Sequence, residues 1–258
     1  MWQTRDSVQA EERQKRIFDY LTKVEFASLE DLSTQLDVSV STVRRDVTSL
    51  EGSGKVRRTH GGARLAVPES DEFAFASRDV HQFNEKEAIG RATAALIAPN
   101  QTVIMDAGST VYHVAKYLEP KTPHIVTNSL PITNHYAANH QVEVIVSGGV
   151  IYPRLGVMVG PLAERAFSEI NADVAIMGAG GITLEGISNS HVLLIDIQLA
   201  MIKAARKVIF CVDHTKIGRQ SLTRLCDLDQ IDAIVTDAGA PEDALAEYRT
   251  RGVEVIVG

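Results

Sequence analysis

The sequence has few cysteines and few aromatic residues. Only Cys211 and Cys226 occur among 258 residues, and aromatic side chains make up 5% of the chain. A single pair of cysteines without metal-ligand spacing forms neither the disulfide framework of a small secreted domain nor a structural zinc site. We therefore expect both thiols to be reduced residues packed in a core.

Long hydrophobic runs are also absent. No stretch approaches the roughly 20 apolar residues that a membrane-spanning helix needs. The first residues, MWQTRDSVQAEERQKR, include no apolar segment of signal-peptide length. With 45% hydrophobic and 23% charged residues, the composition is that of an ordinary folded protein. We expect a cytoplasmic protein that does not enter a membrane.

Positive charge is scarce overall but locally concentrated. The net charge is −7, yet residues 1–67 contain 11 Lys and Arg against 10 Asp and Glu, whereas residues 68–258 contain 15 against 23. Within residues 39–66, six basic residues accompany two acidic ones. Because charge interactions are screened over about 10 Å, this basic segment can bind nucleic acid although the whole chain is acidic. The asymmetry predicts two domains with different tasks.

Hydrophobic periodicity predicts three short helices at the beginning of the chain. The first covers residues 10–24. The second begins after Ser28, with Asp31 completing a capping-box pattern, and ends near residue 37. Ser39 is the expected N-cap of the third, which ends near the glycines at 52 and 54. One face of this third helix carries apolar residues at spacings of 3, 4 and 3: Val40, Val43, Val47 and Leu50.

The opposite face of the third helix is polar and basic. It carries Ser41, Thr42, Arg44 and Arg45. Adjacent arginines suit guanine edges or phosphates, because the guanidinium group donates two hydrogen bonds in a fixed fork. The next run, KVRRTHGGARL, predicts a hairpin around a Gly-Gly turn. Together these features predict a winged helix-turn-helix domain over residues 9–66, with the helix-turn-helix at about 27–46 and the wing at 55–65.

The rest of the chain predicts an α/β domain over residues 85–258, after a linker over residues 67–84. An amphipathic helix at 85–98 is followed by seven β-branched runs that alternate with helical segments. Continuous apolar runs are typical of strands buried on both faces, and hence of a mostly parallel sheet covered by helices. The predicted strands are 102–108, 124–129, 142–149, 173–180, 207–213, 232–237 and 253–257.

Glycines and small polar residues end several of these strands. The segments are DAGST (106–110), TNS (127–129), SGG (147–149) and GAGG (178–181). Ligands of open parallel sheets bind at the carboxyl ends of strands, and glycine followed by hydroxyls at a helix start suits an anion. The turns together predict a phosphate cradle, although each alone is more often a structural turn. Because Thr183 replaces the last glycine of G-x-G-x-x-G, we expect no nicotinamide cofactor.

Another strand end carries Asp213 and Lys216, within CVDHTKIGR. This lysine can neutralise a phosphate, and a solvated loop lysine is the alternative interpretation. The histidines lie on different predicted elements without ligand spacing, so we expect no metal. We also predict no catalytic residue.

These segments resemble the DeoR family of bacterial sugar-metabolism repressors over nearly the whole chain, from about residue 11 to 237. The most specific parts are STVRRDVTSLEGSGKVRRTHGGA at 41–63, and then DAGST, TNS, SGG and DHTKIGR in the family's order and spacing. The resemblance implies a winged helix-turn-helix joined to a sensor domain similar in fold to ribose-5-phosphate isomerase, without a cofactor. It also implies a homo-oligomer, a dimer or tetramer, that binds double-stranded operator DNA and releases it when a phosphorylated sugar binds.

The resemblance also implies two sets of site residues. Those expected to meet DNA are Ser39, Ser41, Thr42, Arg44, Arg45, Lys55, Arg57, Arg58, His60, Gly61 and Gly62. Those expected to line the effector pocket are Asp106, Gly108, Ser109, Thr110, Thr127, Asn128, Ser129, Gly148, Gly149, Asp213 and Lys216.

The chain departs from the family at two positions. Leu194 and Gln198 stand where members often carry an acidic residue and, four positions later, a lysine. We hypothesise that replacement contacts come from Asn189, Ser190 or Asp196.

Two other functions fit the sequence. An aldose-ketose phosphate isomerase could use Asp106, Asp213 and Lys216, but it needs a base within about 3 Å of the abstracted proton, and it leaves the N-terminal domain unexplained. A transcriptional activator, or a regulator that responds to a non-sugar anion, is the other alternative.

Overall fold

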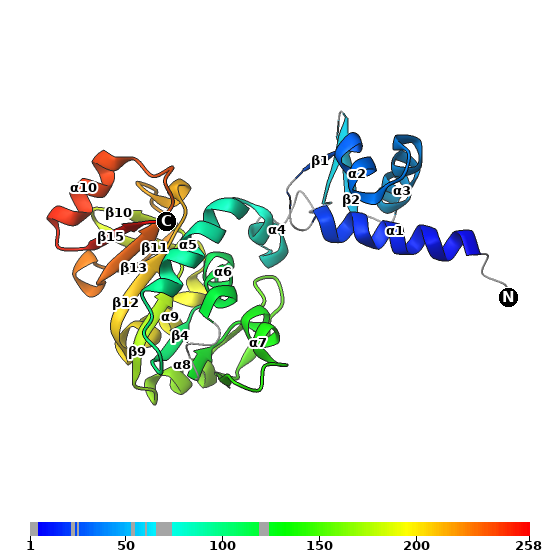
Figure 1. The fold of residues 1–258 in the computed structure, drawn as a ribbon. Coiled ribbons are helices and arrows are strands. Elements are labelled where there is room, and N and C mark those ends of the chain that lie inside the picture. The colour runs from blue at the N-terminus through cyan, green and yellow to red at the C-terminus, as the bar shows by residue number, and fades with distance from the viewer. Residues whose placement is uncertain are drawn as a thin grey trace. The chain divides into compact units, whose positions relative to one another are not determined.

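A computed structural model describes residues 5–21, 24, 26–52, 55–59, 61–65, 74–118 and 124–258. The chain divides into two compact units, Met1–Phe83 and Asn84–Gly258, and their elements are labelled in Figure 1. None of the described helices is long and apolar enough to cross a membrane.

The first unit contains the three predicted helices and the predicted hairpin. The capping box at the start of α2 is confirmed, because Ser28 Oγ accepts from the Asp31 N–H and Asp31 Oδ2 accepts from the Ser28 N–H. Asp37 ends α2 with a left-handed φ of 52°. The elements are α1 (Arg5–Leu21), β1 (Ala27–Ser28), α2 (Leu29–Leu36), α3 (Val40–Gly52), β2 (Val56–Thr59), β3 (Gly62–Leu65) and α4 (Phe75–Val80).

The described strands of this unit form an antiparallel sheet in the order β1-β3-β2. The two-residue strand β1 was not predicted. It can approach β3 because Gly62 has no side chain: a Cβ there would lie 2.3 Å from the Ala27 carbonyl oxygen. The predicted linker contains α4, and its residues up to 73 lie outside the described residues.

The three helices pack through the predicted apolar stripe of α3. Val43, Val47 and Leu50 are buried, whereas Val40 is only partly covered. They share a core with residues of α1, α2 and the sheet, including Ile17, Leu21, Leu32, Leu36, Val56 and Ala63.

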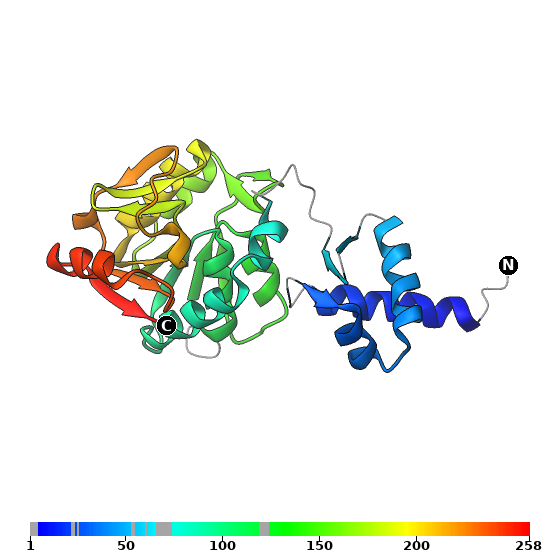
Figure 2. The same ribbon diagram turned by 90° about the horizontal axis from the view of Figure 1, so that it is seen from above.

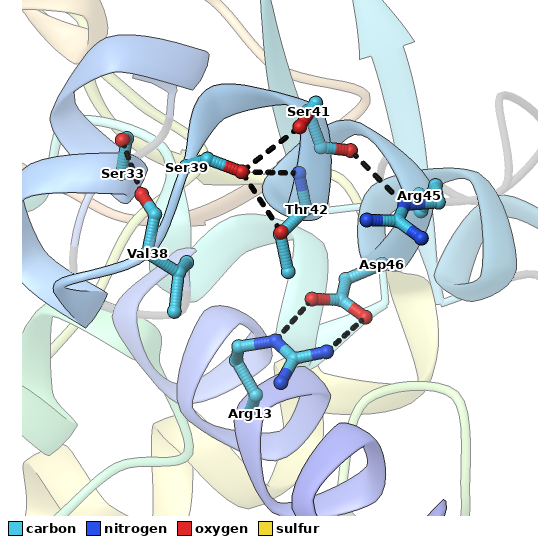
Figure 3. A network of polar contacts seen from close by, with 8 residues as sticks. All are labelled: Arg13, Ser33, Val38, Ser39, Ser41, Thr42, Arg45 and Asp46. Carbon is cyan, nitrogen blue, oxygen red and sulfur yellow. Dashed lines mark hydrogen bonds and ion pairs between the residues drawn. The ribbon is translucent and has the colours of Figure 1, made fainter. Parts of the chain in front are cut away.

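An ion pair joins α1 to α3 beside this core. Arg13 Nε lies 2.5 Å from Asp46 Oδ2, and Arg13 Nη2 donates to Asp46 Oδ1 at 3.0 Å (Figure 3). Asp46 is buried, so the two-point pairing satisfies a carboxylate that water cannot reach. Hydrogen bonding to Asp46 raises the pKa of Arg13. The pair lies on the same side of α3 as its buried apolar stripe, and both contacts leave the opposite face of α3 outward.

The second unit is built on a parallel sheet of seven described strands in the order β15-β14-β12-β9-β4-β5-β6. All of its strand pairs are parallel, and all seven predicted strands are confirmed. Their bounds are β4 (Thr102–Met105), β5 (His124–Thr127), β6 (Glu143–Val146), β9 (Ala172–Met177), β12 (Ala205–Cys211), β14 (Ala233–Thr236) and β15 (Glu254–Val257).

Helices cover both faces of this sheet (Figure 2). Alternate residues of β4 belong to different cores: Val103 and Met105 lie in one cluster and Ile104 lies in the other. This alternation explains the continuous apolar runs, since both faces of each central strand are buried. The helices are α5 (Phe83–Ala95), α6 (Ser109–Leu118), α7 (Leu130–Tyr136), α8 (Pro161–Ser168), α9 (Ile195–Ala204) and α10 (Glu242–Thr250).

Five short strands at the carboxyl edge of the sheet were not predicted. The hairpin β7–β8 connects β6 to α8. A small antiparallel sheet, β10-β11-β13, lies between β9 and β14 in the chain order. The bounds are β7 (Val150–Tyr152), β8 (Val157–Val159), β10 (Gly181–Thr183), β11 (Gly186–Asn189) and β13 (Thr223–Cys226).

We expect Asp46→Ala to destabilise the first unit by about 1.5–3 kcal/mol, the usual value of charge-assisted hydrogen bonds. Urea titration of the full chain, followed by far-UV circular dichroism, measures this change. Asp19→Ala is the matched control, because Asp19 is an exposed acidic residue of α1. Equal unfolding midpoints in the two variants would contradict a stabilising role for the Arg13–Asp46 pair.

We also expect both thiols to be inert in the folded protein. Burial raises the pKa of Cys211 and of Cys226 to about 12. At pH 8 the reactive thiolate is therefore scarce, and reaction with a disulfide reagent should be at least about a hundredfold slower than in the denatured chain. Thiol titration with and without denaturant tests this, and rapid labelling of the native protein would show that a cysteine is accessible.

Candidate nucleic-acid interface and ligand site

The N-terminus of α3 is held by a cluster of hydroxyl groups. Ser39 Oγ accepts from the Thr42 N–H at 3.2 Å, as predicted for an N-cap. The same oxygen lies 2.9 Å from Ser41 Oγ and 2.9 Å from Thr42 Oγ1 (Figure 3). Two hydroxyls that are each hydrogen-bonded to Ser39 thus lie with it at the helix end where phosphate oxygens bind favourably.

Arg44 and Arg45 are both exposed on α3. Arg45 Nε donates to the Ser41 carbonyl oxygen at 3.4 Å (Figure 3). Arg44 lines an open groove of about 420 Å³ between α3 and the hairpin. The groove is lined by Leu29, Arg44, Val47, Glu51, Arg58, Thr59, Gly61 and Gly62. The helix and the hairpin therefore present one continuous surface.

Arg58 of the hairpin is paired within its own unit. Its Nε lies 2.5 Å from Glu51 Oε2, and its backbone N–H donates to Glu51 Oε1 at 3.0 Å. The hydrogen bond from this backbone N–H, together with the guanidinium, lowers the pKa of Glu51. The sequence predicted that Arg58 contacts DNA. In the structure, its pairing with Glu51 also holds β2 against the end of α3.

The remaining predicted DNA contacts have different surroundings. Lys55 and Arg57 are exposed. Gly61 has a φ of 90°, and its carbonyl oxygen accepts from the Leu29 N–H, so it forms the turn of the hairpin. Gly62 is buried against β1, and His60 lies outside the described residues.

The predicted ligand site lies where the strand order reverses. The chain places β5 and β6 on one side of β4, and β9, β12, β14 and β15 on the other. Clefts at such reversals bind ligands in open parallel sheets. Asp106 follows β4, and its Oδ2 accepts from the Gly178 N–H, which follows β9, at 3.2 Å. This carboxylate joins the two halves of the sheet at the predicted site.

Gln198 of α9 contacts the same carboxylate. Gln198 Nε2 donates to Asp106 Oδ2 at 2.6 Å, and Gln198 Oε1 accepts from Asn189 Nδ2 at 2.9 Å. All three side chains are buried. From the sequence, Gln198 is only a departure from the family pattern. Its contact with Asp106 was not predicted, because residues 106 and 198 are joined by tertiary packing alone.

The three residues hypothesised to provide replacement contacts have different surroundings in the structure. Asn189 belongs to the hydrogen-bond chain with Gln198. Asp196 is exposed on α9. Ser190 Oγ lies 2.7 Å from Ser221 Oγ. Leu194 is buried at the start of α9.

Thr127, Asn128 and Ser129 lie at the end of β5, covered by the β7–β8 hairpin. All three are almost completely buried. Asn128 Nδ2 donates to the Met158 carbonyl oxygen at 3.1 Å, and the Asn128 carbonyl accepts from the Met158 N–H. Asn128 Oδ1 is buried without a hydrogen-bond partner among the described residues. It is therefore an acceptor to which a bound molecule could donate, once the hairpin gives access.

The other predicted ligand residues form turns at the same edge. Ser109 and Thr110 begin α6 and are buried. Gly108 faces Gly178, since a Cβ on Gly108 would lie 3.9 Å from the Gly178 Cα. Gly148 and Gly149 have φ of 67° and 111° and connect β6 to β7.

Asp213 and Lys216 follow β12, which is separated from β4 by β9. Asp213 Oδ1 accepts from the Thr215 N–H at 3.0 Å and caps its own short helical turn. Because neighbouring strands lie about 4.8 Å apart, the strands that carry Asp106 and Asp213 are separated by roughly 10 Å. Among the described residues, no group of three His, Cys, Asp or Glu side chains could hold a metal ion.

Comparisons with known proteins agree with this architecture. The DeoR-like helix-turn-helix domain matches residues 13–69, and the DeoR C-terminal sensor domain matches residues 81–238. The transcriptional regulator GolR of Listeria innocua is 31% identical over 95% of this chain and 97% of its own length. The transcriptional repressor GlcR of Bacillus subtilis is 32% identical over 96% of each chain.

Among solved structures, ribose 5-phosphate isomerase A of Methanocaldococcus jannaschii is 15% identical, with a TM-score of 0.36 over 51% of this chain and 52% of its own. The two domain matches and the full-length relatives place the protein in its family: the chain belongs to the DeoR family of transcriptional regulators.

Proposed function

We propose that the protein is a repressor of sugar or carbohydrate metabolism genes, which binds operator DNA through α3 and the β2–β3 hairpin and releases it when a phosphorylated sugar binds at the strand ends. The observation that carries the proposal is the outward presentation of Arg44 and Arg45 on a helix whose other face is buried. Proteins of this architecture act as homo-oligomers on two-fold operators, and we propose a dimer or tetramer here.

The charges of the first unit support the DNA-binding role. The exposed basic residues Arg44, Arg45, Lys55 and Arg57 lie on α3, on β2 or directly before it. A helix of the size of α3 fits the major groove, which is about 12 Å wide. Burial of the apolar stripe, together with the Arg13–Asp46 ion pair, leaves the basic face of α3 outward, which supports contacts of the two arginines with base edges or phosphates.

We expect Arg44→Ala to weaken operator binding by about 1–3 kcal/mol, the value of a bidentate contact between arginine and guanine. Fluorescence anisotropy on DNA that flanks the protein's own gene, compared with random DNA at two salt concentrations, measures the effect. Arg206→Ala is the control, because Arg206 is an exposed arginine of the second unit. An unchanged preference for operator over random DNA in Arg44→Ala would remove the base-reading role of this residue.

The geometry of the strand ends supports the effector proposal. The reversal between β4 and β9 brings together a buried carboxylate, two glycines and the N-terminus of α6, whose first hydroxyls belong to Ser109 and Thr110. Backbone N–H groups at a helix start bind phosphate, while Asn128 Oδ1 can accept from a sugar hydroxyl. We infer that Gln198 is a positioning residue that holds Asp106 and α9 in place around the ligand.

We therefore expect Gln198→Ala to lose most of the stabilisation that an effector gives. The probes are ribose 5-phosphate, glucose 6-phosphate and fructose 6-phosphate, with the unphosphorylated sugars and inorganic phosphate for comparison. A ligand at about 100 times its Kd stabilises the folded protein by roughly 2.7 kcal/mol, which appears as a thermal shift of several degrees.

Lys203→Ala is the control for the thermal-shift experiment, because Lys203 is exposed on the same helix. An active sugar phosphate should stabilise this control as much as the unchanged protein. If no sugar phosphate shifts the melting temperature, the effector belongs to another class of anion. If Gln198→Ala responds fully, the positioning role is wrong.

A further inference from the structure

The β7–β8 hairpin covers the end of β5, where three of the predicted ligand residues lie. Thr127, Asn128 and Ser129 are 0%, 0% and 1% exposed to solvent. Val157 of β8 forms an antiparallel bridge with Ser129, so the hairpin lies directly over this strand end. A ligand can therefore contact these residues only after the hairpin has moved.

Hydrogen bonds hold the hairpin onto the end of β5. The Met158 N–H donates to the Asn128 carbonyl oxygen at 2.8 Å, and the Leu130 N–H donates to the Gly156 carbonyl oxygen at 2.9 Å. Asn128 Nδ2 also donates to the Met158 carbonyl oxygen. These bonds all join the hairpin to residues 128–130, so a single movement of the hairpin breaks them together.

The apolar side chains of the hairpin are buried outside the main cores. Leu155, Val157 and Met158 are buried, yet neither of the two core clusters that the described residues form around the large sheet includes them. Both cores can therefore stay packed while the hairpin moves. A local opening of this kind requires less free energy than global unfolding.

Glycines lie at both ends of the hairpin. Gly148 and Gly149 precede β7 and Gly160 follows β8, with φ of 67°, 111° and 95°. Glycine adopts these angles without steric cost, so the backbone rotates easily there. A Cβ on Gly148 or Gly160 would meet none of the described atoms within 4 Å. Because Val150 pairs with Val159, the two ends lie side by side and can act as one hinge.

The hinge is anchored on a helix that belongs to the core. A Cβ on Gly149 would lie 3.1 Å from the Ala163 side chain of α8. Ala163 and Phe167 of this helix are buried in one of the two core clusters. The hairpin can therefore rotate about a fixed support.

The Asn128 amide can join the hairpin to a ligand. Its Nδ2 donates to the hairpin, whereas its Oδ1 is buried without a hydrogen-bond partner among the described residues. An unsatisfied buried acceptor is unfavourable, and a hydroxyl group of a ligand would satisfy it. Because both atoms belong to one planar amide, a ligand that donates to Oδ1 also favours the orientation in which Nδ2 holds the hairpin closed.

We propose that the β7–β8 hairpin is a gate of the effector site, which opens at its glycine hinge to admit the ligand and closes when a ligand hydroxyl donates to Asn128 Oδ1. The inference rests on the proposed function, since it assigns Asn128 to the hydroxyl-bearing part of the phosphorylated sugar. Such a site discriminates against an analogue without that hydroxyl, because the buried acceptor then stays unpaired.

Thiol labelling of Ser129→Cys in the full-length protein, without ligand, measures the opening. The new thiol lies under the hairpin, opposite Val157. We expect a disulfide reagent to label it at least about a hundredfold faster than the buried Cys211 and Cys226 of the same chain. Low urea concentrations should not accelerate this labelling, because a local opening exposes little surface. Thermal melting shows that the variant remains folded.

Thr236→Cys is the matched control for the labelling experiment. Thr236 is also 0% exposed, and it ends β14, which lies on the far side of β9 from β5. Its new thiol should react as slowly as the native cysteines. Equally slow labelling of Ser129→Cys, or labelling that requires urea, would overturn the gate.

Hydrogen exchange tests the gate in the unchanged protein. The Met158 and Leu130 amides should show similar protection, because one opening breaks both of their hydrogen bonds. Both should exchange faster than the Asp106 amide, which donates to the Ile176 carbonyl oxygen within the large sheet. Protection of both amides as strong as that of Asp106 would contradict a local opening.

The same amides report closure over a ligand. A sugar phosphate that raises the melting temperature should increase the protection of the Met158 and Leu130 amides, and a stabilising compound that leaves both unchanged would overturn the closure. If none of the sugar phosphates stabilises the protein, the proposed effector class fails, whereas the labelling without ligand still decides whether the hairpin opens.

Discussion

The second unit depends on the contact that the Asp106 carboxylate makes across the reversal of strand order. It accepts from the Ala107 and Gly178 N–H groups and from Gln198 Nε2, so one buried side chain joins the ends of β4 and β9 to α9. A buried carboxylate without such donors would cost several kcal/mol. This requirement fixes the geometry of the strand ends, because the two halves of the sheet cannot separate there without leaving a charge unsatisfied.

Strands that are buried on both faces could be predicted from the sequence, because such burial produces a continuous apolar run. Val103, Ile104 and Met105 form a continuous apolar run because alternate residues enter different cores, and the central strands were found for this reason. The hairpin β7–β8 was missed since Val150 and Ile151 are exposed and its short strands are defined by their pairing. The two-residue strand β1 similarly exists only through its contact with β3.

Motifs predicted which candidate site residues lie at helix starts and strand ends, but not which of them contact other side chains of the protein. The hydroxyls at the start of α3 and the turns at the strand ends follow from local sequence. By contrast, Arg58 was assigned to DNA, and its pairing with Glu51 requires the hairpin to fold back on α3. Gln198 was noted as an irregularity, and only the approach of α9 to β4 reveals it as a partner of Asp106. Periodicity and spacing do not encode such contacts, because the residues are far apart in the chain.

The magnitudes are compatible with the proposed regulation from the strand ends. A hundredfold loss of DNA affinity corresponds to about 2.7 kcal/mol of coupling, and a net hydrogen bond contributes roughly 0.5–1.5 kcal/mol. Two to five hydrogen bonds that differ between the bound and free states are therefore sufficient. The buried chain Asn189–Gln198–Asp106 and the unsatisfied Asn128 Oδ1 offer that number within one site. In the proposed regulation, a ligand that engages them would act on α9 and on the β7–β8 hairpin, the two elements that these side chains contact.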